Sequence, residues 1–184
     1  MSDLTKRENV LALLHEFTAS ESLRRHAYAV EAAMRAAAER TGHDPDEWGA
    51  IGLIHDFDYE RHPEAPDHPL KGAEILRERG YPEDFVRTVL SHASYTGVPR
   101  DTDRARWLFA VDELCGFCMA CAMVQPDRRI ASVKVKSVKK KLKDKDFAAK
   151  VNREEIHEGA AGLGLELDEL IAFVLAALVP VADD

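Results

Sequence analysis

Apolar residues recur every three or four positions along nearly the whole chain, and no stretch alternates between apolar and polar residues as a half-buried β-strand does. The clearest stripe runs through Leu23, Ala27, Val30, Met34 and Ala37, which lie on one face of a helix. A chain of 184 residues is long enough to bury a substantial core. The pattern therefore predicts an all-α protein, folded as a compact single-domain helical bundle.

Capping residues, prolines and glycines predict where these helices begin and end. Thr5 and Ser20 are candidate N-caps, Gly42 ends the second helix, and Asp44 followed by Pro45 opens a third helix that continues through His55 and Asp56. Loops are expected at 58–67 and 96–103. Further helices are predicted from Pro69 to Gly80, from Pro82 through Leu90 to His92, and at 104–124, 134–145, 147–162 and 168–178. We expect residues 1–125 to form the main helical domain, with the C-terminal helices of 126–184 packing on it.

The charge balance argues against two classes of partner. The chain carries 25 Lys and Arg residues against 33 Asp and Glu residues, a formal net charge of −8. Binding to nucleic acid or to a membrane surface generally needs a positive footprint. We therefore expect neither nucleic acid nor a membrane as partner.

The sequence predicts a cytoplasmic protein. Charges are spread through the N-terminal residues, so we expect no signal peptide. The apolar run 170–181 is shorter than the roughly 20 residues that a membrane span needs. Cys115, Cys118 and Cys121 follow the pattern of some iron–sulfur ligands, but they lie in an apolar run without a fourth cysteine. We expect them to be small buried side chains on a core helix in a reducing compartment.

Several ionisable residues fall on helix faces that are otherwise apolar. His26 follows Leu23 and precedes Val30 on the apolar stripe, and Asp112 lies among Leu108, Phe109 and Cys115. His55 and Asp56 are flanked by apolar residues, and His92 follows Phe85 and Val89. Any one of these histidines alone would more often be a satisfied core or surface residue than a ligand. Together they indicate a metal site, because buried carboxylates need compensation and imidazole and carboxylate are ligands of divalent metals.

A second ion would need further nitrogen ligands, and two loop histidines are candidates beside His92. His68 immediately precedes Pro69, at the expected start of a helix. His62 also precedes a proline in the same loop, so the choice between them stays open. The carboxylate of Asp56 has two oxygens and is able to bridge two ions.

The ordered set of His26, His55-Asp56, His68, His92 and Asp112 resembles the HD-domain metal-dependent phosphohydrolase superfamily. The local segments resemble those of small bacterial members: RHAYAVEAA, GLIHDFDYE, HPLKGAEIL, VLSHASY and AVDEL. The resemblance covers residues 26 to 112, about half of the chain. It implies an α-helical HD-type domain within residues 1–125.

The resemblance also implies a set of ligands. His26, His55, Asp56 and Asp112 would hold a first divalent ion, and Asp56 would bridge to a second ion held by His68 and His92. The metal would be one or two ions of manganese, iron, cobalt, nickel or zinc. Many relatives have a lysine shortly after the HD pair, where this chain has Phe57-Asp58-Tyr59. Lys71 is a candidate replacement, so His55, Asp56 and Lys71 are the expected catalytic residues.

The implied activity is hydrolysis of a phosphate ester by a metal-activated water, with a nucleotide or a small phosphorylated metabolite as substrate. Two other functions stay open: a di-iron oxygenase of the same fold, and a non-catalytic binding module that contains metal. Arg25, Lys71 and Arg100 are candidates to orient the phosphate, although each is more simply a solvated surface charge.

A lysine-rich stretch is the second notable feature. Seven lysines between 134 and 145 surround Val135, Val138 and Leu142, which predicts an amphipathic helix with a basic outer face. The simpler interpretation is a solvated face that offsets an acidic domain. The alternative is a basic lip that attracts an anionic substrate.

Overall fold

The computed structural model describes residues 3–182, and within that range every regular element is helical. This confirms the all-α prediction. The longer helices are α1 (Arg7–Phe17), α2 (Glu21–Thr41), α3 (Pro45–Ile54), α4 (Asp67–Glu78), α5 (Glu83–Leu90), α6 (Asp103–Met123), α7 (Val135–Leu142), α8 (Arg153–Gly162) and α9 (Leu167–Ala182). Three single 3₁₀ turns complete them: η1 (Asp3–Thr5), η2 (Ser94–Thr96) and η3 (Ile130–Ser132).

Several helix ends follow directly from side-chain chemistry. The Ser20 hydroxyl accepts from the backbone N–H of Leu23 at the start of α2, and Gly42 ends that helix with a φ of 77°. The Asp44 carboxylate accepts from the backbone N–H groups of Asp46 and Glu47 at the start of α3. One predicted cap was wrong: Lys6, not Thr5, occupies the N-cap position of α1, because the preceding residues form a 3₁₀ turn.

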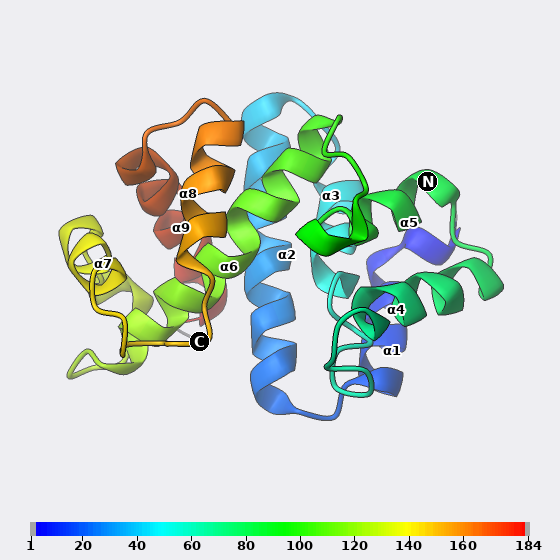
Figure 1. Cartoon of the computed structure of the whole chain (residues 1–184), viewed down its shortest axis with the longest axis horizontal. Helices are drawn as coiled ribbons and strands as arrows, with labels where there is room; N and C mark the ends of the chain where they lie inside the picture. Colours follow the sequence, from blue (N-terminus) through cyan, green and yellow to red (C-terminus); the bar gives the residue numbers. More distant parts are fainter. Residues whose placement is uncertain (1–2, 183–184) are drawn as a thin grey trace.

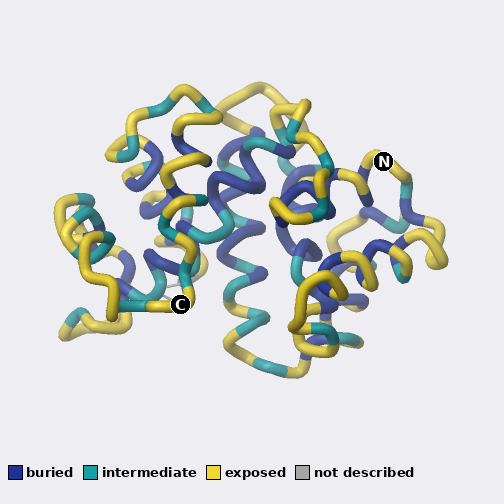
Figure 2. Tube along the Cα trace, viewed as in Figure 1, coloured by how far each residue is buried: buried dark blue, intermediate teal, exposed yellow. Residues whose placement is uncertain are grey.

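Two long helices, α2 and α6, form the centre of the molecule (Figure 1). Helix α3 packs along α2, and α1, α4 and α5 lie on the same side of the bundle. Helices α8 and α9 pack against α6 and α2 on the other side. Figure 2 shows that the buried parts of the chain gather in α2, α3 and α6. The centre of the bundle is therefore where side chains from distant parts of the sequence meet.

The hydrophobic core is continuous from α1 to α9. It includes Val10 from α1, Leu114 from α6, Ile156 from α8 and Leu170 from α9, each at most 1% exposed. Cys115, Cys118 and Cys121 are unpaired and buried on α6, which confirms their expected role as small core side chains. None of the helices between residues 3 and 182 combines the length and apolar character that crossing a membrane demands.

The predicted helix bounds were wrong at three places that matter for the site. Helix α3 ends at Ile54, so His55 and Asp56 lie in the turns that follow it rather than within the helix. Helix α5 ends at Leu90, two residues before His92. Residues 147–152 are not helical, because the Asn152 side chain accepts from two backbone N–H groups and starts α8 there. In each case a helix end lies close to the residues that carry ionisable groups.

Candidate metal centre

Six ionisable side chains, carried by α2 and α6 and by the ends of α3, α4 and α5, converge at the centre of the bundle. His26 lies on α2, His55 and Asp56 follow α3, and Asp112 lies on α6. The other two flank shorter helices: His68 at the start of α4 and His92 just after α5. His68 (φ −79°, ψ 134°) and Pro69 (φ −94°, ψ 16°) both have non-helical backbone angles, so regular α-helix begins after Pro69 rather than at Pro69, where it was predicted to begin. The set is His26, His55, Asp56, His68, His92 and Asp112, and its members form two groups that share Asp56.

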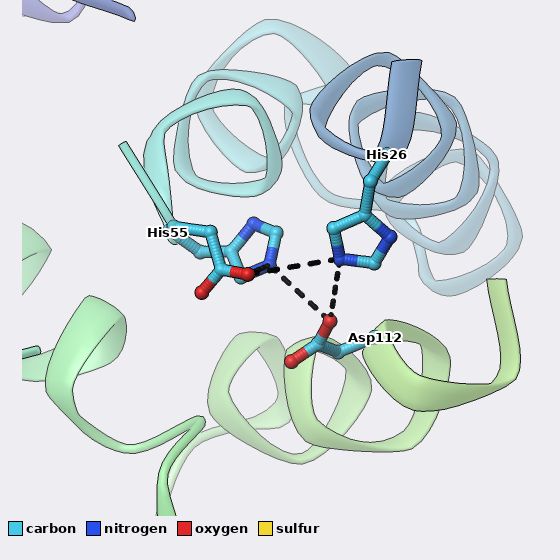
Figure 3. Close-up of side chains that lie close together, drawn as sticks. His26, His55 and Asp112 are labelled. Atoms are coloured by element: carbon cyan, nitrogen blue, oxygen red, sulfur yellow. Dashed lines mark hydrogen bonds and ion pairs between the residues drawn. The ribbon is translucent and has the colours of Figure 1, made fainter. Parts of the chain in front are cut away.

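The first group contains His26, His55, Asp56 and Asp112, whose ligand atoms all lie within 4.8 Å of one another. The Oδ1 atom of Asp112 lies 2.9 Å from His26 Nε2 and 3.2 Å from His55 Nε2 (Figure 3). The Oδ2 atom of Asp56 lies 3.5 Å from His55 Nε2 and 3.9 Å from His26 Nε2. Two imidazole nitrogens therefore face two carboxylate oxygens across a small space.

The second group uses the other oxygen of Asp56. Its Oδ1 atom lies 3.1 Å from His68 Nε2 and 3.2 Å from His92 Nε2. The two imidazole Nε2 atoms are 3.2 Å apart. His62 belongs to neither group, so the structure brings together His68, not His62, with Asp56 and His92.

Three of the histidines are held by their other ring nitrogen. The Nδ1–H of His55 donates to the carbonyl of Gly52 (2.8 Å), and that of His92 donates to the carbonyl of Val89 (2.5 Å). A carbonyl can only accept, so the hydrogen is on Nδ1 and, in the neutral ring, Nε2 carries a lone pair. The Nδ1–H of His68 donates to a carboxylate oxygen in the same way, 2.9 Å away. All three Nε2 atoms are thereby presented as potential metal ligands.

These lone pairs meet other electron-rich atoms. His68 Nε2 faces His92 Nε2, and His55 Nε2 faces two carboxylate oxygens. The Nε2 atom of His55 is also buried and has no hydrogen-bond partner among residues 3–182. Such an arrangement is stable only with positive charge between the atoms, supplied by protons or by a metal ion. Imidazole nitrogen and carboxylate oxygen are ligands of divalent transition metals, so the residues fit that group.

The pKa values of the clustered side chains indicate which groups carry the positive charge when no metal is bound. Burial opposes protonation of His55, but the carboxylates of Asp56 and Asp112 outweigh it and hold the pKa of His55 well above its ordinary value. Burial also opposes protonation of His68, but bonds to Asp56 and Asp58 raise its pKa to about 9. Burial would raise the pKa of Asp56 and of Asp112, yet the facing imidazoles hold both pKa values well below the usual range. Without metal, His55 and His68 are therefore held as imidazolium groups beside the carboxylates of Asp56 and Asp112.

Asp58 is the site residue that the sequence prediction missed. Its side chain is fully buried, and it accepts hydrogen bonds from His68 Nδ1 (2.9 Å) and from the backbone N–H of Gly72 (2.9 Å). A Cβ atom at position 72 would lie 2.7 Å from Asp58 Cγ, so only glycine allows the carboxylate this close to α4. The signal was present in the sequence, because an unexplained glycine inside a helix costs about 1 kcal/mol.

Asp58→Asn is expected to weaken binding at the second group about 10- to 100-fold while leaving the first group able to bind. The asparagine keeps the size of the side chain, but one of its two oxygens becomes a donor, so His68 loses its charged partner. Titration of the purified protein with metal, followed by calorimetry, measures both affinities. Asp67→Asn, on the exposed start of α4, is the matched control. Equal affinities in wild type and Asp58→Asn would show that Asp58 does not orient His68.

Lys71, the expected catalytic lysine, is not brought into the cluster. It lies on the exposed face of α4, where its Nζ pairs with Glu74 at 3.0 Å. The hydroxyl of Tyr95 instead donates to the backbone carbonyl of His68, and the ring of Tyr59 packs edge-on against the His68 imidazole. Tyr59 and Tyr95, rather than Lys71, therefore contact His68 of the second group.

A cavity of about 590 Å³ opens onto the cluster. Members of both groups line it, together with Tyr59, Tyr95, Glu113 and Lys150. None of the lysines of 134–145 lines this cavity. Lys136, Lys139, Lys140 and Lys143 instead border a separate groove beside Asp168. The basic face of α7 is thus not at the mouth of the metal cluster.

The fold and this cluster define a helical protein with a paired His/Asp site compatible with divalent metal. Comparison with known protein families agrees: the HD domain model matches residues 23–115, about half of the chain and a range that includes all six clustered residues. The chain belongs to the HD domain family, the superfamily of metal-dependent phosphohydrolases. No curated protein and no solved structure matches the chain.

Proposed function

We propose that this protein is a phosphohydrolase that cleaves a phosphate ester of a nucleotide or small phosphorylated metabolite with a metal-activated water. His26, His55, Asp56 and Asp112 would hold one ion, and Asp56, His68 and His92 a second. The observation that carries the proposal is the placement of Asp56, whose Oδ2 faces the first group and whose Oδ1 faces the second. A carboxylate so placed between two groups of nitrogen ligands is suited to bridge two ions.

Two divalent ions bound here would supply a water of lowered pKa and positive charge beside the phosphoryl group. The chain orients the ligand histidines. Backbone carbonyls hold the Nδ1 hydrogens of His55 and His92, and Asp58 holds that of His68, so each Nε2 is free of a proton when the ring is neutral. The cavity of about 590 Å³ has the size of a site for a small molecule.

A phosphate-release screen combined with metal analysis tests the proposal. The protein would be purified without chelator, its metal content measured, and phosphomonoesters and nucleotides offered with manganese, iron, cobalt, nickel or zinc. We expect between one and two ions per chain and metal-dependent release of phosphate. Oxygen-dependent turnover by an iron form without phosphate release would indicate an oxygenase instead. Metal without any turnover would indicate a binding module.

Single ligand substitutions are expected to separate the two ions. His68→Ala and His92→Ala leave the first group with all four of its side chains, so about one ion per chain should remain. His26→Ala removes a ligand from the first group only, so it should weaken that site and spare the second. His62→Ala, in the same loop as His68, is the matched control and should keep full occupancy. Loss of all metal in every ligand variant would instead indicate a single mononuclear centre.

A further inference from the structure

Part of the cavity wall comes from outside the family match. Lys150, Val151 and Glu155 line the same cavity as His26, Asp56, His68 and Asp112, yet they lie well beyond residue 115. Lys150 and Val151 belong to the irregular segment before α8, and Glu155 lies in the first turn of that helix. The C-terminal part of the chain therefore completes the space in front of the cluster.

Hydrogen bonds fix this segment relative to the ligands. The backbone N–H of Asn152 donates to Glu113 Oε2 (3.1 Å), and Glu113 directly follows Asp112 on α6. The hydroxyl of Ser94, which lies two residues after His92, donates to Glu155 Oε1 (2.9 Å). The start of α8 is thus tied to both sides of the cavity.

Close packing between helices holds α8 itself in place. Gly159 of α8 lies against α6 so closely that a Cβ atom there would be 2.6 Å from Ala110 Cα. The guanidinium of Arg153 donates to the carbonyls of Ala148 (3.1 Å) and Val151 (2.8 Å), which closes the irregular segment on either side of Lys150. The backbone that carries Lys150 therefore has a defined position beside the cavity.

Lys150 is the only lysine or arginine that lines this cavity within residues 3–182. It makes no ion pair in that part of the chain, whereas the cations expected from the sequence are engaged elsewhere. Arg25 lies in an adjoining groove and pairs with Glu21 at 2.8 Å. Arg100 donates to the carbonyl of Ser91 and stacks on the ring of Phe109.

We propose that Lys150 binds the phosphoryl group of the substrate in the cavity that the metal ligands also line, and that the substrate carries a single phosphate. This rests on the proposed function. An unpaired ammonium beside a metal cluster is suited to a phosphate oxygen that the metals leave exposed. Besides the metal ligands, Glu113 and Glu155 are the acidic residues that line the cavity. The negative charge of Glu155 disfavours a second and third phosphate, so a phosphomonoester whose remainder is neutral or cationic fits best.

Phosphate binding to the metal-loaded protein tests Lys150 without requiring turnover. Calorimetry with inorganic phosphate would compare wild type, Lys150→Gln and Lys150→Arg, with metal content measured in each. Loss of one charge-assisted hydrogen bond is expected to weaken phosphate binding about 10- to 100-fold in Lys150→Gln, and Lys150→Arg should recover most of it. Lys145→Gln makes the same charge change at an exposed position outside the cavity and should bind phosphate as wild type does.

Steady-state kinetics complete the test. We expect kcat/KM for p-nitrophenyl phosphate to fall in Lys150→Gln by the same factor as phosphate affinity, and wild type to prefer nucleoside monophosphates over triphosphates. A wild-type protein that hydrolyses esters while Lys150→Gln binds phosphate unchanged would overturn the inference and leave the proposed function intact. Weaker phosphate binding in Lys150→Gln without hydrolysis of any ester by wild type would support the phosphate site and refute the hydrolase. A preference for triphosphates would overturn the single-phosphate assignment.

Discussion

Replacing Asp56 with alanine is expected to abolish phosphate release and to lower the metal content below one ion per chain. The variant leaves the second group with two histidines and the first with three ligands, because Asp56 is the residue that both groups share. Bound metal contributes several kcal/mol of transition-state stabilisation, and about 1.4 kcal/mol corresponds to a factor of ten. We therefore expect kcat/KM to fall about a thousandfold or more.

Metal analysis and a phosphate-release assay on the same preparation measure both effects. Asp67→Ala removes an exposed aspartate a short distance along the chain and should retain the metal and activity of wild type. Circular dichroism would establish that Asp56→Ala keeps its helical content. A folded Asp56→Ala variant with two ions per chain would refute the bridging role of Asp56.

Removing the metal is expected to lower the melting temperature, and by more at high pH than at low pH. Binding to the folded state stabilises it by about 2.7 kcal/mol when free metal is a hundredfold above Kd. Metal binding requires neutral imidazoles, so affinity rises with pH. The metal-free protein behaves in the opposite way, because its cluster is held together by protonated histidines next to carboxylates.

The directions of the pKa shifts determine how the stability of the metal-free protein changes with pH. The pKa of His68 is raised from 6.5 to about 9 by its carboxylate partners once they outweigh burial. Its stabilising contribution, about 3 kcal/mol, is complete below 6.5 and is lost as pH rises toward 9. The pKa values of Asp56 and Asp112 are lowered, so their contribution is present above about 4 and is lost as pH falls. The metal-free protein should therefore be most stable between about pH 4 and 6.5.

Thermal melts with chelator and with excess metal, at about pH 6 and about pH 8.5, measure this directly. We expect the difference in melting temperature between the two forms to be several degrees and to widen at the higher pH. His43→Gln changes an exposed histidine outside the cluster and should show the same widening. A difference that narrows with rising pH would mean that the clustered histidines do not bind the metal as neutral ligands.

The amino-acid sequence by itself determined the fold class and most helix ends. Short-range patterns are sufficient for this, because an apolar stripe, a capping side chain such as Ser20 and a glycine such as Gly42 act within a few residues of where they stand. Five of the clustered residues, His26, His55, Asp56, His92 and Asp112, were predictable from their apolar surroundings, and the resemblance to the HD-domain superfamily added His68. The ends of α3 and α5 were not predictable, because the chain stays buried past both helices, in the turns that carry His55 and His92, and no proline or glycine directly follows either helix.

Only the tertiary structure decided which neighbours complete the cluster. His62 and His68 stand before prolines in the same loop, and the path of that loop between α3 and α4 brings just His68 to Asp56. Asp58 becomes a partner of His68 only because Gly72, in another element, lets α4 approach it. The packing of α8 on α6 likewise brings Lys150 to the cavity, whereas Lys71, inside the motif, faces solvent. Contacts between elements far apart in the chain depend on how whole helices pack, and local sequence patterns do not predict that packing.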